Sequence, residues 1–258
     1  MKNLKLLKRR ADLGSLPAGK LLINTINAHS YNIAQKDALH AEALIKGDVL
    51  LPDGVSIVMA IKLLRREKIN RITGWDLFMF EMKKLDRVGG TCFFLGSSEN
   101  VLEIIKTKAA KDFKNIKVVT YSPPYKEEFT KEDSAAMIDA INAAKPDLLW
   151  IGMTAPKQEK WVYTHIDQLN INCHIGTIGA VFDFYAGTVK RAPIGWQKYG
   201  LEWLFRLLME PRRMWRRYLI GNTLFIYYIL KEKLTFSAPP NPISVYQLIF
   251  AKQYKLTA

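Results

Sequence analysis

Short apolar runs alternate with amphipathic stretches between residues 20 and 187. The runs are of the length and composition that favour strands. They predict six strands, at residues 21–24, 48–51, 92–95, 116–121, 147–151 and 172–178. Between them, apolar residues recur at helical spacing, as at Tyr31, Ala34 and Ala38. Because strands and helices that alternate in this way build βαβ units, the pattern predicts an α/β fold with a mostly parallel sheet flanked by helices on both faces.

The last part of the chain has a different pattern. Residues 193–233 are helical in period, rich in Trp, Tyr and Arg, and not interrupted by predicted strands. The charged residues of this stretch are mainly basic: Lys198, Arg206, Arg212, Arg213, Arg216, Arg217, Lys231 and Lys233 against Glu202, Glu210 and Glu232. Three prolines follow, Pro239, Pro240 and Pro242. We expect a folded body at residues 1–192 and a basic helical C-terminal appendage at 193–258.

Charge narrows the classes of partner. The 258 residues carry a formal net charge of +14, which indicates an anionic partner such as nucleic acid, anionic lipid or a phosphorylated small molecule. The longest apolar run, residues 218–230, is shorter than the roughly 20 residues that a membrane-spanning helix needs. No apolar signal-peptide segment follows the basic start, and Cys92 and Cys173 lie far apart in apolar runs. We expect a cytoplasmic protein that can associate with a membrane surface.

Small and polar residues gather directly after the predicted strands. They are Thr25 and Asn27, residues 52–54, residues 96–98, residues 152–159 and residues 176–183. In open parallel sheets, ligands bind at the carboxyl ends of the strands. This clustering predicts a ligand site at that edge of the sheet.

Asp53 has two interpretations. A carboxylate at a strand end, beside Gly54, can act as general base on a substrate hydroxyl. The alternative is a Pro-Asp-Gly turn in which Asp53 caps the helix expected to begin near Val55. The residue by itself favours the second interpretation.

Three further segments can hold phosphate. Lys157 and Gln158 open a predicted helix, and free N–H groups at a helix start suit an anion. The loop that begins at Gly96 offers a weaker signal of the same kind. Arg71, before another predicted helix, can reach a diphosphate. The alternatives are a solvated Lys157 and a surface Arg71, and the sequence leaves them open.

The sequence lacks the motifs of several other classes of enzyme. The sequence has no G-x-G-x-x-G, no G-x-S-x-G and no Asp-x-Asp pair for a metal bound to a nucleotide diphosphate. The four histidines have no metal-ligand spacing. We therefore expect no metal and no cofactor. If the substrate is a nucleotide sugar, positive side chains and helix dipoles must stabilise the leaving diphosphate instead.

The basic aromatic appendage has three interpretations. Arginines beside Trp215 and Tyr218 suit anionic headgroups and the membrane interface. RNA binding fits the composition, but no recognised RNA module accompanies it. The third interpretation is a packed helix with a solvated basic face.

With these residues assembled, the chain resembles the WecG/TagA/CpsF glycosyltransferase family. The matching segments cover most of the chain and occur in the family's order. They are residues 25–27, 51–55, 71–78, 94–96, 156–161, 176–183, 187–193, 200–206 and 210–212.

The resemblance implies a Rossmann-like fold and a metal-independent, inverting transfer from a UDP-sugar. The transferred sugar is an N-acetylhexosamine such as ManNAc, a uronic acid or a hexose, and the acceptor is a sugar on a polyprenyl diphosphate. Asp53 matches the family's proposed base, and Thr25 matches a residue of the substrate pocket. Arg71 and Gln158 match diphosphate and donor contacts. The appendage matches a membrane-docking segment that contributes arginines.

Our interpretation is therefore a glycosyltransferase of cell-surface polysaccharide synthesis, peripheral on the cytoplasmic face of the bacterial inner membrane. Asp53 is its expected base. The expected substrate-binding residues are Thr25, Asn27, Arg71, Gly96, Gly152, Lys157, Gln158, Asp183, Arg206 and Arg212. Nucleic acid is not an expected partner, whereas a homo-oligomer is. Two rivals remain, a UDP-sugar-binding regulator without turnover and an RNA-binding protein.

Overall fold

The computed structural model describes residues 6–234. Six strands form one sheet in the order β2-β1-β6-β5-β3-β4, and every neighbouring pair is parallel. The strands are β1 (Leu21–Ile26), β2 (Val49–Pro52), β3 (Gly90–Gly96), β4 (Ile116–Tyr121), β5 (Leu148–Gly152) and β6 (His174–Thr177). The predicted α/β class and all six predicted strands are confirmed, although β1 continues to Ile26.

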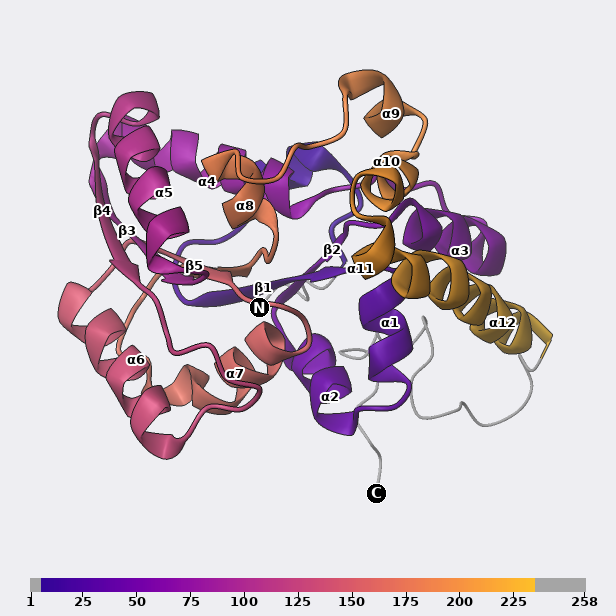
Figure 1. The fold of residues 1–258 in the computed structure, drawn as a ribbon, viewed down its shortest axis with the longest axis horizontal. Coiled ribbons are helices and arrows are strands. Elements are labelled where there is room, and N and C mark those ends of the chain that lie inside the picture. The colour runs from indigo at the N-terminus through magenta and orange to yellow at the C-terminus, as the bar shows by residue number, and fades with distance from the viewer. Residues whose placement is uncertain (1–5, 235–258) are drawn as a thin grey trace.

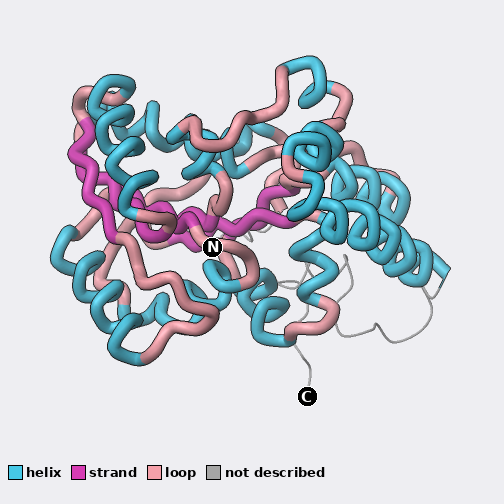
Figure 2. Tube along the Cα trace, viewed as in Figure 1, coloured by secondary structure: helices cyan, strands magenta, loops and turns pink. Residues whose placement is uncertain are grey.

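Helices cover both faces of the sheet. They are η1 (Arg10–Ser15), α1 (Ala28–Ala34), α2 (Ala38–Lys46), α3 (Val55–Arg65), α4 (Gly74–Val88), α5 (Glu99–Asp112), α6 (Lys131–Ala144), α7 (Lys157–His165), η2 (Ile166–Gln168), α8 (Val181–Ala186), α9 (Ile194–Lys198), α10 (Glu202–Met209), α11 (Pro211–Trp215), η3 (Arg216–Ile220) and α12 (Gly221–Leu234). Helices α4, α5 and α8 lie on one side of the sheet, and α2, α6 and α7 lie on the other (Figure 1). Figure 2 shows the sheet, in magenta, running between these two layers.

The buried strands are apolar at successive positions because both faces are covered. In β3, Phe94 packs in the apolar cluster that includes α4, α5 and α8, whereas Phe93 packs in the cluster that includes α6 and α7. In β5, Trp150 and Ile151 divide between the two clusters in the same way. Successive residues of a strand point to opposite faces, so a sheet covered on both sides requires continuous apolar runs.

The neighbours β3 and β5 continue in opposite directions, β3 to the edge strand β4 and β5 back to β6. Ligands of open α/β sheets bind beyond the carboxyl ends of the strands at such a switch point. Gly96 and Gly152 end these two strands. A Cβ atom at Gly152 would lie 2.5 Å from the ring of Phe182. Glycine at this position therefore lets α8 close over the end of the sheet.

The C-terminal helices stand at the end of the molecule where β2 lies (Figure 1). Helix α11, the π-helical turn η3 and α12 follow one another without a break. Phe225 and Ile229 of α12 are buried in the same apolar cluster as residues of α1 and α3, and the Phe225 ring meets Tyr31 edge-on with 5.3 Å between centroids.

Within residues 6–234, no helix has both the length and the apolar character that crossing a membrane requires. The division between residues 192 and 193 stays a prediction. Pro239, Pro240 and Pro242 lie outside the described residues.

Candidate functional site

Asp53 lies directly after β2, at the carboxyl edge of the sheet. Its backbone N–H donates to the carbonyl oxygens of Ile26 at 3.0 Å and Leu51 at 2.9 Å, so the ends of β1 and β2 fix the turn. Gly54 is the N-cap residue of α3, and no side chain of the described residues forms a cap hydrogen bond there. The interpretation of Asp53 as a helix cap is therefore wrong.

The Asp53 carboxyl is set up to accept a proton near neutral pH. Its side chain is 30% exposed. Burial raises the pKa of Asp53 to about 6; the charge of Arg71 opposes the shift, and Glu202 and Asp76 add to it. Such a group is ionised at pH 7 and holds a proton more tightly than an ordinary aspartate. These are the properties of a general base.

Arg71 touches Asp53 through the main chain. Its Nε donates to the carbonyl oxygen of Asp53 at 2.7 Å, and its Nη2 lies 3.9 Å from Asp53 Oδ1. The same Nη2 forms an ion pair with Glu202 Oε2. The Arg71 side chain is mostly buried, so the interpretation of a solvated surface arginine is wrong.

Glu202 and Arg191 complete this group of charges. Arg191 Nε donates to Glu202 Oε1 at 3.4 Å, and the Arg191 guanidinium lies over the Trp75 ring, 5.0 Å from its centroid. Glu202 therefore receives two arginines, Arg71 on one oxygen and Arg191 on the other.

Three appendage arginines form a neighbouring set of charges: the charge of Arg217 acts on Asp53, and Arg206 and Arg213 act on Arg217. The Nε atoms of Arg206 and Arg217 are buried and have no hydrogen-bond partner among the described residues. Burial lowers the pKa of Arg217, and the negative charge of Asp53 partly offsets this. Burial raises the pKa of Asp183, and Arg213 and Arg206 oppose the shift. The charges of Arg206 and Asp183 thus act on each other, whereas Arg212 is exposed on α11. The substrate contacts expected of these three residues stay predictions.

Thr25 and Asn27 lie at the end of β1 beside Asp53. Thr25 is paired with Leu51 of β2 in the strand register and is nearly buried. The Asn27 side chain caps α1 by accepting hydrogen bonds from the N–H groups of His29 at 3.0 Å and Ser30 at 3.1 Å. Asn27 therefore has a structural role here in addition to its expected place at the site.

Gln158 joins two loops of the same edge. Its Oε1 accepts hydrogen bonds from the backbone N–H groups of Met153 at 3.3 Å and Gly179 at 3.1 Å, and its Nε2 donates to Glu159 at 2.8 Å. Burial raises the pKa of Glu159 to about 7. Gln158 thus holds the β5–α7 and β6–α8 loops in register.

The Lys157 side chain contacts the loop between β4 and α6. Its Nζ donates to the carbonyl oxygen of Lys126 and lies 3.6 Å from the centroid of the Phe129 ring. In this structure Lys157 packs against the β4–α6 loop, and its expected phosphate contact stays a prediction.

Comparison with known proteins shows the family of the chain. A model of the Glycosyl transferase WecG/TagA/CpsF family matches residues 5–239. The chain belongs to this family. The chain is 30% identical to a relative from Bacillus spizizenii (strain ATCC 23059 / NRRL B-14472 / W23), over 80% of this chain and 77% of the relative. It is 29% identical to one from Bacillus subtilis (strain 168), over 85% and 84%. For a relative from Staphylococcus aureus (strain MW2) the identity is 30%, over 83% and 81%.

All three relatives are named N-acetylglucosaminyldiphosphoundecaprenol N-acetyl-beta-D-mannosaminyltransferase. The resemblance found in the motifs is confirmed, and the protein is a glycosyltransferase of this family.

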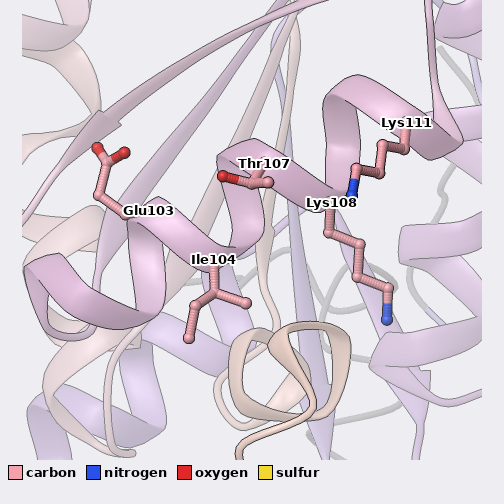
Figure 3. Close-up of a pocket in the computed structure, with 5 residues that line it drawn as sticks. All are labelled: Glu103, Ile104, Thr107, Lys108 and Lys111. Atoms are coloured by element: carbon pink, nitrogen blue, oxygen red, sulfur yellow. The ribbon is translucent and has the colours of Figure 1, made fainter.

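Two further features that could indicate a site are a surface hollow and a cluster of metal-ligand residues. A surface hollow of about 440 Å³ on α5 is lined by Glu103, Ile104, Thr107, Lys108 and Lys111 (Figure 3). None of the expected site residues lines it. In the part of the chain that the structure describes, no three His, Cys, Asp or Glu residues gather as metal ligands would.

The sequence did not single out Glu202, Arg191 or Arg217 as site residues. Glu202 and Arg191 lie in the family-like segments 200–206 and 187–193, and that is the signal that could have found them. Arg217 lies in the appendage, for which the resemblance implies arginines at the site without saying which of them. Its approach to Asp53 depends on how η3 packs on the body.

Proposed function

We propose that this protein transfers N-acetylmannosamine from a UDP donor to N-acetylglucosaminyl-diphospho-undecaprenol, without a metal and with inversion at the anomeric carbon. The names of the three relatives support the sugar and the acceptor. The resemblance described in Sequence analysis supports the UDP donor and the inversion.

One observation carries the proposal: a carboxylate whose pKa burial raises to about 6 lies at the carboxyl edge of the sheet beside a cluster of arginines. In the transfer, the acceptor hydroxyl oxygen attacks the anomeric carbon from the face opposite UDP. The new C–O bond forms as the bond to UDP breaks, UDP leaves with the electron pair, and Asp53 takes the hydroxyl proton. A positioned base contributes about 10²–10⁴-fold.

Arginines are suited to the departing diphosphate. Arg206 and Arg217 have buried Nε atoms without a partner in the described residues, so an anion would satisfy them. Fixed positive groups in a partly dry site stabilise the charge that develops on a leaving group without reorganising. Arg71, with Gln158 holding the neighbouring loops, would meet the same diphosphate from the body of the protein.

The appendage would meet the membrane that holds the lipid acceptor. Its exposed apolar side chains include Leu208, Met209, Trp215, Leu219, Ile220, Ile226, Tyr227 and Leu230. Exposed basic residues, among them Arg212 and Arg216, lie on the same helices. Apolar side chains mixed with arginines fit the interface of an anionic leaflet, here the cytoplasmic face.

The test is UDP release by the purified protein with N-acetylglucosaminyl-diphospho-undecaprenol, in EDTA, across a panel of UDP-sugars. We expect acceptor-dependent release with UDP-N-acetylmannosamine and its loss in Asp53→Asn. A product with the anomeric configuration of the donor would contradict inversion, and full activity of Asp53→Asn would contradict the base.

The two rivals give other results. UDP binding without turnover would support a regulator, and salt-dependent RNA binding with indifference to UDP would support an RNA-binding protein.

A further inference from the structure

We propose that Glu202 is a positioning residue for the transfer. It holds Arg71 away from the carboxylate of Asp53, and the position of α10 thereby affects the pKa of Asp53. This inference rests on the proposed function, in which Asp53 must be free to take a proton.

Arg71 can pair with either of two carboxylates, and the structure pairs it with Glu202. Charge-assisted N–H···O bonds between guanidinium and carboxylate are normally about 2.7–2.9 Å long. Arg71 Nη2 is ion-paired with Glu202 Oε2, whereas its distance to Asp53 Oδ1 is 3.9 Å. Arg71 Nε is occupied by the carbonyl oxygen of Asp53. The Asp53 carboxylate therefore has no close ion pair with Arg71, although the two groups are adjacent.

Glu202 is itself held in place. Its side chain is 14% exposed, and its second oxygen accepts from Arg191 Nε at 3.4 Å. Arg191 in turn lies over the ring of Trp75, on the first turn of α4. Glu202 thus connects α10 with the segments before α4 and after α8.

A second contact joins the start of α10 to the catalytic turn. Gly200 has a φ of +72°, and a Cβ atom there would lie 2.8 Å from a methyl carbon of Val55. Val55 opens α3, directly after Asp53 and Gly54. The backbone before Glu202 therefore packs closely on the turn that carries the base, independently of the ion pair.

Charges from several elements face Asp53. Arg71 precedes α4, Asp76 lies in α4, Arg191 follows α8, Glu202 lies in α10 and Arg217 lies in η3. Removing the charge of Glu202 takes away one carboxylate that raises the pKa of Asp53. It also releases Arg71 to pair with Asp53. Both changes lower the pKa of Asp53 and weaken it as a base.

The experiment compares wild type with Glu202→Gln, Glu202→Asp and Glu210→Gln. Glu210→Gln is the matched control, because it removes one carboxylate from the same appendage, where Glu210 pairs with Arg213 at 3.0 Å. The pKa of Asp53 is read from the ¹³C-carboxyl NMR titration of aspartate-labelled protein, with Asp53→Asn assigning the signal. The acidic limb of the pH profile for UDP release is measured in parallel.

We expect Glu202→Gln to lower the Asp53 pKa by about one unit, a size common for a single nearby charge. The acidic limb should move to lower pH by the same amount, and the plateau rate should fall several-fold. Glu202→Asp should keep part of the wild-type Asp53 pKa and part of the wild-type rate. Glu210→Gln should leave the acidic limb of the pH profile at its wild-type position.

An Asp53 pKa unchanged in Glu202→Gln would overturn the proposal. So would a lower rate at every pH without a shift of the acidic limb. If Glu202→Gln does not fold, the same readings on Glu202→Asp decide: an intermediate pKa supports the proposal and an unchanged one contradicts it. If the Asp53 pKa falls in Glu202→Gln but the wild-type protein releases no UDP from any UDP-sugar, the positioning of Arg71 is supported and the proposed function is contradicted.

Discussion

Arg71 donates a hydrogen bond from Nε to the carbonyl oxygen of Asp53 at 2.7 Å, while its Nη2 lies 3.9 Å from Asp53 Oδ1. The arginine thus fixes the backbone of the turn between β2 and α3 without closing a tight salt bridge on the carboxylate. A tight salt bridge would favour the ionised form and lower the pKa. The observed arrangement positions Asp53, the proposed base, and leaves its pKa raised.

Asp53→Asn should be more stable than wild type at pH 8 but not at pH 4. Burial raises the pKa of Asp53 to about 6, so the ionised carboxyl costs stability in the folded state. Below its unfolded pKa, about 3.9, both states are protonated and the cost is absent; it grows as pH rises towards 6 and is complete above that. The expected gain at pH 8 is on the order of 2 kcal/mol.

Urea unfolding of both proteins at the two pH values measures this difference. An equal difference between the two proteins at pH 4 and pH 8 would mean that the Asp53 pKa is not raised.

Arg71→Lys should lower the rate of UDP release about tenfold or more, with the fold retained. A lysine carries its donors on a single nitrogen and lacks the planar fork, so it cannot reproduce the separate Nε contact with the Asp53 carbonyl and Nη2 contact with Glu202. Steady-state rates and UDP calorimetry check this. Arg87→Lys, at an exposed position near the end of α4, is the matched control and should behave as wild type.

Gly152→Ala should destabilise the protein by about 1–3 kcal/mol, the usual cost of overpacking a core. The new methyl group would lie 2.5 Å from the Phe182 ring, and α8 would have to move off the end of β5. Thermal unfolding measures the loss. Gly195→Ala is the control, because a Cβ there would meet no atom within 4 Å; it should be neutral or slightly stabilising.

Replacing Trp215 and Leu219 together with alanine should weaken binding to anionic vesicles about tenfold, because the pair contributes exposed apolar area from the appendage. Flotation with phosphatidylglycerol-containing liposomes measures the bound fraction. Tyr125→Ala removes a fully exposed aromatic from the β4–α6 loop and should not change it. Unaltered flotation of the double variant would place the membrane contact elsewhere.

The sequence by itself determined the six strands, their parallel arrangement and the edge of the sheet at which the proposed site residues gather. These features are local: each strand is a short apolar run, and a parallel sheet brings residues that follow β1 and β2, such as Thr25 and Asp53, to one edge. Family-like segments around Asp53, Arg71 and Gln158 added the expected chemistry and the family.

Only the tertiary structure decided which charges meet. Glu202 lies far along the chain from Arg71, and periodicity says nothing about whether α10 packs over the β2–α3 turn or faces solvent. Whether Lys157 reaches a ligand or packs on Phe129, and whether Asp53 caps α3 or faces arginines, likewise depends on packing between elements. The pKa of Asp53 follows from that packing, because burial and charges contributed by distant segments set it.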